Sequence, residues 1–277
     1  MKRNIDLISQ INNTSLSDDC IAIWQLGQES MVVKSGETIC YFDPYLSNNV
    51  DDTFGNSPRS FKEPVDPSEI NNADFVFISH DHLDHLDPET LVPIAKNSQK
   101  AKFICPAPHV HILIEIGIEK ERIIAARAKE KINIGGMEIY PVAEKHEDYS
   151  IDSNGNHGYL GYVVRYNEVV FYHAGDTIGF YELAEDLKPL KIDVACLPIN
   201  GRDFKRLKVD NLLGNMDFRE AAELSNIIGA DTIIPMHYDL FGFNTENPAY
   251  FVDYLLNNYP DQKFKLLTLG ERMIYMK

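Results

Sequence analysis

The chain has 277 residues, of which 44% are hydrophobic and 25% are charged, a balance typical of folded globular proteins that excludes a largely disordered chain. Its formal net charge of −16 repels polyanions, so nucleic acid and anionic membranes are not expected partners. The length is compatible with two average domains or with one large α/β unit.

The cysteines and the N-terminus bear on the cellular setting. The four cysteines lie far apart and form no CxxC pair, which argues against a disulfide framework and against a thiolate zinc site. The first 20 residues contain two basic residues but no continuous apolar stretch, so they do not resemble a secretory signal. No apolar run reaches the roughly 18 residues of a membrane span. We therefore expect a cytoplasmic protein with a small-molecule substrate, and a homo-oligomer remains open.

In the first half of the chain, apolar runs of strand length alternate with helical patterns. Strands are predicted at residues 20–27, at 30–45 with a turn at Ser35-Gly36, and at 73–79. A helix is predicted at 88–97, because Asp87 is a suitable cap and proline favours the first helical position. The polar segment between the last strand and this helix therefore lies on a strand-to-helix loop.

The longest irregular segment is residues 46–67. Connections of this length without secondary structure are uncommon in compact domains and are often functional. An active-site lid and a solvated insertion are both compatible with the sequence.

The second half of the chain repeats the alternation of strands and helices. Predicted here are strands at 136–144, 191–200 and 230–235, a hairpin at 158–177 turned at Asn167-Glu168, and a helix at 217–229. Metal-competent side chains recur where strands end, at His146, Asp176 and His237. Two strand-rich halves with helix–strand units suit a four-layer αββα sandwich, so we predict one α/β domain over residues 1–277.

The densest polar motif is "FISHDHLDHLDPE" at residues 77–89. In an extended loop His80 and His82 point the same way, and Asp84 and His85 follow from the next turn. Neutral imidazoles and an ionised carboxylate suit a borderline divalent metal, and one rigid loop lowers the entropic cost of assembling the site. A surface turn that binds metal adventitiously is the alternative, but the flanking strand and capped helix favour a built site.

These segments resemble the metallo-β-lactamase-fold hydrolases. The general motif is carried by "SHDHLDHLD" together with Asp43 in "YFDPY", His146 in "AEKHED", Asp176 in "YHAGDT" and His237 in "IPMHYD". The chain is also similar to the branch that contains L-ascorbate-6-phosphate lactonases, in "AIWQLGQES", "LPINGRDF" and "NMDFREAAELSNIIGADTIIPMHYDLF". Some lactonases of this branch carry an acid where His146 stands, so the branch alone does not fix the metal or the substrate.

The resemblance implies a centre of two divalent ions. One ion would be bound by His80, His82 and His146, and the other by Asp84, His85 and His237, with Asp176 bridging both; Asp84 and Asp176 are also the catalytic carboxylates. Asp43 would hydrogen-bond behind the ligands and orient an imidazole, although a plain Asp-Pro turn is the alternative. The ligand set suits zinc, manganese or iron. The resemblance favours manganese, with zinc next.

Two such ions can lower the pKa of a shared water and polarise a substrate oxygen, so no side-chain nucleophile is required. The chain offers no GxSxG elbow. The resemblance favours a hydrolase that opens a lactone of a sugar-acid phosphate or cleaves a similar small anionic ester. A phosphodiesterase acting on a phospholipid or a nucleotide is the runner-up, and a metal-binding protein without catalysis is the third reading.

Three residues are candidates to bind the substrate. Arg202 lies in the basic segment 201–208, and its planar guanidinium suits a phosphate or a carboxylate; a solvated basic loop is the alternative. Asn200 directly precedes this segment, and His157 lies in a Gly- and Asn-rich loop that could reach the rim of the site. His109 and His111 are expected to be structural, and His173 is expected either to pack in the core or to lie behind the ligands.

Overall fold

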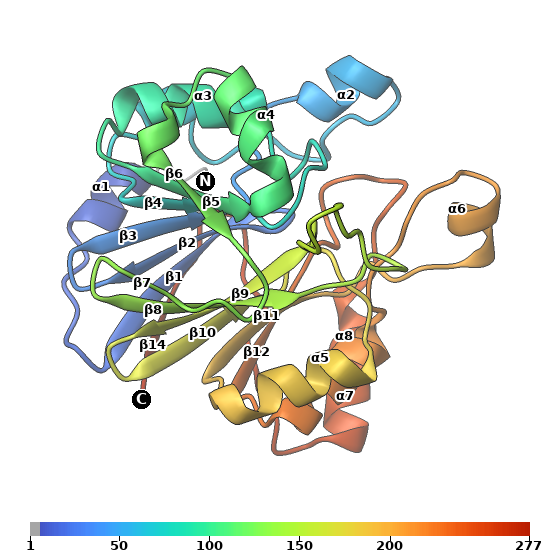
Figure 1. Ribbon diagram of the computed structural model, residues 1–277. Helices are drawn as coiled ribbons and strands as arrows, with labels where there is room; N and C mark the ends of the chain where they lie inside the picture. The colour runs from blue at the N-terminus through green and yellow to red at the C-terminus, as the bar shows by residue number, and fades with distance from the viewer. Residues whose placement is uncertain (1–5) are drawn as a thin grey trace.

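Two seven-stranded sheets lie face to face in the computed structural model, which describes residues 6–277 (Figure 1). The two basic residues noted near the N-terminus lie outside this range. In spatial order the first sheet consists of β14 (Arg272–Met276), β1 (Cys20–Gly27), β2 (Ser30–Ser35), β3 (Thr38–Phe42), β4 (Phe75–Phe77), β5 (Lys102–Pro106) and β6 (Ile123–Ala126). The second consists of β13 (Lys263–Phe264), β12 (Thr232–Met236), β11 (Val194–Pro198), β10 (Val169–His173), β9 (Leu160–Tyr166), β8 (Met137–Ala143) and β7 (Ile132–Ile134).

Helices cover the outer face of each sheet (Figure 1). The first sheet is covered by α1 (Leu7–Asn12), α3 (Pro88–Asn97) and α4 (Val110–Glu115), and the second by α5 (Tyr181–Leu187), α7 (Phe218–Ile228) and α8 (Pro248–Asn258). Two short helices, α2 (Asn49–Phe54) and α6 (Phe204–Lys208), lie in loops that project from the sandwich (Figure 1). Within residues 6–277, no helix combines the length and apolar character needed to cross a membrane.

Strand β1 shows why the sheets have two apolar faces. Ile21 and Ile23 belong to the buried cluster that the two sheets share, whereas Ala22 and Trp24 belong to the cluster beneath α1 and α3. Successive side chains of a strand point to opposite faces, so a continuous apolar run requires cover on both sides. The predicted four-layer αββα sandwich is therefore confirmed.

Strand direction gathers the functional loops at one edge. Strands β3 to β6 are parallel in the first sheet, and β10 to β13 are parallel in the second. In parallel sheets the carboxyl ends of the strands lie together and their loops form the binding crevice. Asp43, the histidine motif, Asp176 and His237 all follow such carboxyl ends.

The helix boundaries agree with the sequence signals. Asp87 accepts a hydrogen bond from the Glu89 amide at the start of α3. Asp217 forms a capping box at the start of α7, and Gly229 ends that helix in the left-handed conformation. The predicted strands are also present, with shorter bounds at 75–77 and 194–198.

Other elements differ from the expectations or were not predicted. Segment 46–67 is not wholly irregular, because residues Asn49–Phe54 form α2. Arg59 donates to the carbonyls of Tyr45 and Ser47, and the Ser60 amide donates to the Leu240 carbonyl, which ties this segment to the body of the protein. Strands β5, β6, β7, β13 and β14 and helices α1, α5, α6 and α8 were not predicted from the sequence. A role of segment 46–67 as a lid stays a prediction.

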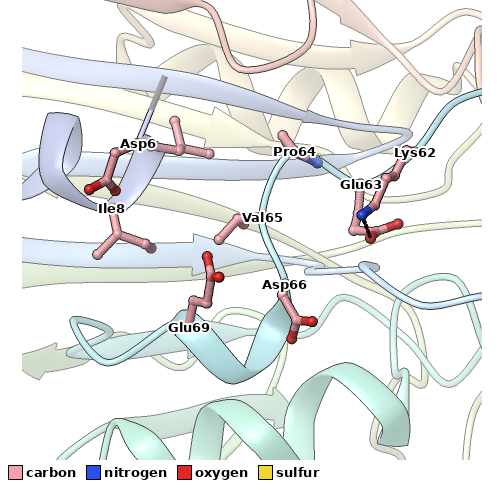
Figure 2. A pocket seen from close by; sticks show the side chains of 9 residues that line it. Asp6, Ile8, Lys62, Glu63, Pro64, Val65, Asp66 and Glu69 are labelled. Atoms are coloured by element: carbon pink, nitrogen blue, oxygen red, sulfur yellow. Dashed lines mark ion pairs between the residues drawn. The ribbon is translucent and has the colours of Figure 1, made fainter. Parts of the chain in front are cut away.

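A cavity of about 730 Å³ lies between α1 and residues 62–69, where none of the metal-ligand candidates lines it (Figure 2). Its carboxylates include Asp6, Glu63, Asp66 and Glu69. Asp6 caps α1 by accepting from the Ser9 amide, and Asp66 accepts from the Ser68 amide. Asp6 and Asp66 therefore have a structural role in this cavity that requires no bound ligand.

Candidate metal centre

Three strand ends and the loop after β4 bring the seven predicted ligands together. His80 and His85 are fully buried in this loop, and His82 and Asp84 are partly exposed beside them. His146 follows β8, Asp176 follows β10, and His237 follows β12. The seven residues form three overlapping groups whose ligand atoms lie within 4.8 Å of one another.

Asp176 lies at the middle of the cluster and faces two sets of histidines. Its Oδ2 atom is 3.4 Å from His146 Nε2 and 4.0 Å from His80 Nε2. Its Oδ1 atom is 3.2 Å from His237 Nε2 and 3.4 Å from His85 Nε2. We call His80, His82 and His146 the His80 half, and Asp84, His85 and His237 the Asp84 half. One carboxylate therefore presents one oxygen to each half.

The unpaired atoms of the cluster fit a bound cation. His80 Nε2, His85 Nε2 and Asp176 Oδ1 are buried and have no hydrogen-bond partner. Leaving buried polar atoms unpaired costs free energy, and each of these is an atom that binds divalent metals in proteins. The described residues thus provide a donor set of imidazole nitrogens and carboxylate oxygens that suits divalent metal ions.

The protonation states of the His80 half favour binding. Burial lowers the pKa of His146 to about 4, and burial together with neighbouring histidines lowers the pKa of His80 well below its ordinary value. Both imidazoles are therefore neutral at pH 7, which is the form that binds metal. Burial alone raises the pKa of Asp176, but His237 and His85 bring it well below its ordinary value. Asp176 is thus a carboxylate.

Asp43 lies directly behind the histidine loop. Its Oδ2 atom is 2.8 Å from His85 Nδ1, and its Oδ1 atom accepts from the Ser79 amide at 2.7 Å. A carboxylate at Nδ1 fixes that proton and leaves His85 Nε2 to face the cluster. The backbone at Asp43 and at His237 is left-handed, with φ of 40° and 60°. Such conformations cost energy for residues with a side chain and concentrate at functional sites.

Three residues near the cluster were missed in the sequence. Gln28 and Glu29 lie in the turn between β1 and β2, and the Tyr159 ring centroid is 4.9 Å from that of His80. Both carboxylate oxygens of Glu29 are buried without a partner, and its pKa is raised well above its ordinary value by burial and by nearby Asp176. The available signal was a polar pair, Gln-Glu, between two runs expected to be buried strands.

The predicted substrate-binding residues have other partners. Arg202 donates from both terminal nitrogens to Glu220, each at 2.7 Å. Asn200 donates to Asn244 and accepts from Asn215. We call these five residues the Arg202 network. Both terminal nitrogens of Arg202 are thus paired with a carboxylate, and substrate binding by Arg202, Asn200 and His157 stays a prediction.

The remaining histidines lie away from the seven ligands or support the fold. His157 packs against Tyr149, with ring centroids 4.8 Å apart, on the loop that follows His146. His173 pairs through Nε2 with the Glu29 carbonyl, and His109 does so with the Gly158 carbonyl, both at 2.8 Å. His111 Nδ1 lies 2.8 Å from the Pro108 carbonyl. Among residues 6–277, no hydrogen bond or ring contact joins His157 to the seven ligands.

The sequence of the chain matches a known protein family. A family model for the beta-lactamase superfamily domain matches residues 40–238. A UPF0173 metal-dependent hydrolase of Nitratidesulfovibrio vulgaris is 29% identical over 251 residues, which are 89% of this chain and 92% of that protein.

Solved structures share the fold. Igni18, a metallo hydrolase from Ignicoccus hospitalis, superposes with a TM-score of 0.71 at 20% identity, covering 93% of this chain and 99% of that one. An isothiocyanate hydrolase from Delia radicum gut bacteria gives a TM-score of 0.73 at 18% identity, covering 92% and 99%. At these sequence identities the solved structures support the fold but do not identify the substrate.

Proposed function

Because the chain belongs to the beta-lactamase superfamily of metal-dependent hydrolases, we propose that it uses two divalent ions to open a lactone, or cleave a similar ester, of a small anionic substrate such as a sugar-acid phosphate. The observation that carries the dinuclear part is the position of Asp176, whose two oxygens face different sets of histidines. Manganese and zinc are the proposed metals, with iron as a further candidate.

Each half of the cluster has a defined part in this proposal. The His80 half and the Asp84 half would each hold one ion, and Asp176 would be shared between them. Bound there, the ions supply Lewis acidity and a water of lowered pKa, so that no side-chain nucleophile is needed. Asp43 holds the Nδ1 proton of His85, which keeps the other ring nitrogen aimed into the cluster.

The choice of a lactone rests on the resemblance to the lactonase-containing branch. The anionic character of the substrate rests on it too, because Arg202 is paired with Glu220. A cytoplasmic setting is part of the same proposal, and the four cysteines, all free and buried, are consistent with a reducing compartment. Phosphodiester cleavage is the competing reaction, since the same donor set could serve it.

The test begins with protein purified without added metal. Elemental analysis gives the identity and number of ions, and one panel of lactones and phosphodiesters is then assayed on that preparation. We expect lactone hydrolysis that is abolished by a chelator and restored by manganese or zinc. Preferential cleavage of a phosphodiester would move the function to the competing reaction, and absence of metal-dependent turnover on either class would contradict a hydrolase.

A further inference from the structure

Ser79 directly precedes the histidine motif, and its side chain lies behind the cluster. It is 2% exposed, and its carbonyl accepts a hydrogen bond from the Leu160 amide at 3.0 Å. A β-carbon added at Gly175 would lie 2.6 Å from the β-carbon of Ser79, so this close approach leaves room for glycine only. Gly175 also has a left-handed φ of 63°, and it precedes Asp176. The Ser79 side chain is therefore packed against the segment that carries the shared ligand.

The Ser79 hydroxyl lies between a carboxylate and an imidazole. Its Oγ atom is 2.5 Å from Asp43 Oδ2 and 2.9 Å from His80 Nδ1. Asp43 also accepts from the Ser79 amide at 2.7 Å, as an ionised carboxylate does. Such a carboxylate only accepts hydrogen bonds, whereas a hydroxyl has a single proton to donate. The Ser79 proton is therefore donated to Asp43, and Oγ can only accept from His80.

This pattern of donors and acceptors fixes the position of the His80 proton. A neutral imidazole carries one proton, and the hydrogen bond made by one ring nitrogen decides the state of the other. Because Oγ of Ser79 accepts, the proton lies on Nδ1 and Nε2 keeps its lone pair. His80 Nε2 is the buried atom without a partner that lies on the Asp176 side of the ring. The metal-binding tautomer of His80 is thus prepared before any ion binds.

The same carboxylate also serves the other half of the cluster. Asp43 Oδ2 is 2.8 Å from His85 Nδ1, and His85 Nε2 is likewise buried without a partner. Asp43 therefore orients His85 directly and His80 through Ser79. One buried anion holds a ligand of each half, and Ser79 is the residue that extends its effect to the His80 half.

We propose that Ser79 is a positioning residue of the metal centre, which sets the Nδ1-protonated tautomer of His80 by connecting it to Asp43. This role rests on the metal-dependent function proposed above and adds a residue to it. Groups behind a ligand typically change metal affinity or activity by about 10- to 100-fold. Loss of the Ser79 hydroxyl should act on the ion of the His80 half, because Asp43 still reaches His85 without it.

The first test measures the metal affinities of the full-length protein by competition with a chelator, with Zn²⁺ and with Mn²⁺. In Ser79→Ala we expect one ion to be weakened by about 10- to 100-fold and the other to be nearly unchanged. The matched control is Ser98→Ala. Ser98 is 4% exposed, and its hydroxyl also makes two hydrogen bonds, to the Ile70 carbonyl and from the Ala73 amide, neither of which involves a ligand. We expect the control to keep both parental affinities.

The second test observes the tautomer directly. Long-range proton–nitrogen NMR spectra of metal-free protein labelled with ¹⁵N-histidine show which ring nitrogen is protonated, and the His80 signals are those that disappear in His80→Gln. In the parent we expect the His80 proton on Nδ1. In Ser79→Ala we expect the Nε2-protonated form to appear, whereas in Ser98→Ala the parental tautomer should remain. Loss of stability alone would not produce this difference.

The outcomes separate the role of Ser79 from the proposed function. A His80 proton on Nε2 in the parent contradicts the role of Ser79, whether or not the variants fold. Ser79→Ala contradicts it as well if the variant keeps either the parental affinities or the parental tautomer, and so does an equal loss of affinity in Ser98→Ala. A parent that binds fewer than two ions contradicts the dinuclear function instead, while the tautomer of His80 still tests Ser79.

Discussion

Two neighbouring polar regions of this protein differ in how their buried atoms are satisfied. In the metal centre, His80 Nε2, His85 Nε2 and Asp176 Oδ1 have no partner. In the adjoining Arg202 network, the guanidinium is paired in a bidentate manner with Glu220. The two regions are connected, because His146 Nδ1 lies 2.9 Å from the carbonyl of Gly214, next to Asn215.

This difference in pairing distinguishes residues whose polar atoms are suited to bind a ligand from residues that stabilise the fold. A buried polar atom without a partner carries a desolvation cost that a bound ligand can offset, whereas a paired group already contributes to stability. Substitutions in the metal centre should therefore change metal binding more than folding. Substitutions in the Arg202 network should do the reverse.

The largest effect is expected for Asp176→Ala. Removal of this carboxylate deletes a ligand shared by both halves, so we expect at most one tightly held ion and a loss of activity of at least about 100-fold. Elemental analysis and kcat/KM on the best substrate provide the measurement. Asp186→Ala is the control, because Asp186 is an acid that pairs with Lys129 at the surface. Two ions in Asp176→Ala would show that Asp176 does not bridge.

A smaller effect is expected for Asp43→Asn. The amide keeps the shape of the side chain but weakens the acceptor for His85 Nδ1, and losses behind a metal ligand are typically about 10- to 100-fold in metal affinity or activity. The measurement is turnover at limiting metal, together with the far-ultraviolet circular dichroism spectrum. Parental turnover under these conditions would make Asp43 a turn residue only.

Substitutions in the Arg202 network should lower the stability of the fold. Glu220→Gln weakens the pairing with Arg202 and the capping box of α7, so we expect a loss of about 1 to 3 kcal/mol in the free energy of unfolding. Urea unfolding of the metal-free protein measures it, and metal content should stay at the parental value. Glu223→Gln on the same helix is the control. Loss of an ion in Glu220→Gln would place this network in the metal centre.

The companion substitution Arg202→Ala tests the substrate role predicted from the sequence. Because Glu220 already neutralises the guanidinium, we expect kcat/KM for neutral and anionic esters to fall by similar factors, within about threefold of each other. A loss of tenfold or more confined to the anionic substrate would instead restore Arg202 as an anion-binding residue.

The smallest effect concerns the cysteines, which do not belong to the groups of possible metal ligands. Burial raises the pKa of Cys40 and of Cys105 to about 12, and that of Cys196 well above its ordinary value. The reactive thiolate forms only as pH rises towards these values, so at pH 8 the native protein should react slowly with a disulfide reagent. Removal of the metal should leave these rates nearly unchanged. A large acceleration after chelation would show that the core opens when the centre is empty.

The sequence by itself determined the local parts of this protein. The His-x-His-x-Asp-His motif lies within one loop. The apolar strand before it and the capped helix after it can be recognised from the neighbouring residues. The caps at Asp87, Asp217 and Gly229 are likewise local. Local signals are readable because strand and helix periodicity and cap chemistry depend on residues a few positions apart.

Only the tertiary structure decided the partners that are distant in sequence. The C-terminal strand β14 pairs with β1, more than two hundred residues away, and Arg202, in the loop before α6, pairs with Glu220 of α7. The same holds for Gln28, which reaches Asp84 and His237 from a hairpin that precedes both. An apolar strand or a single polar residue fits many partners equally well, and the choice among them is made by how the sheets and helices pack.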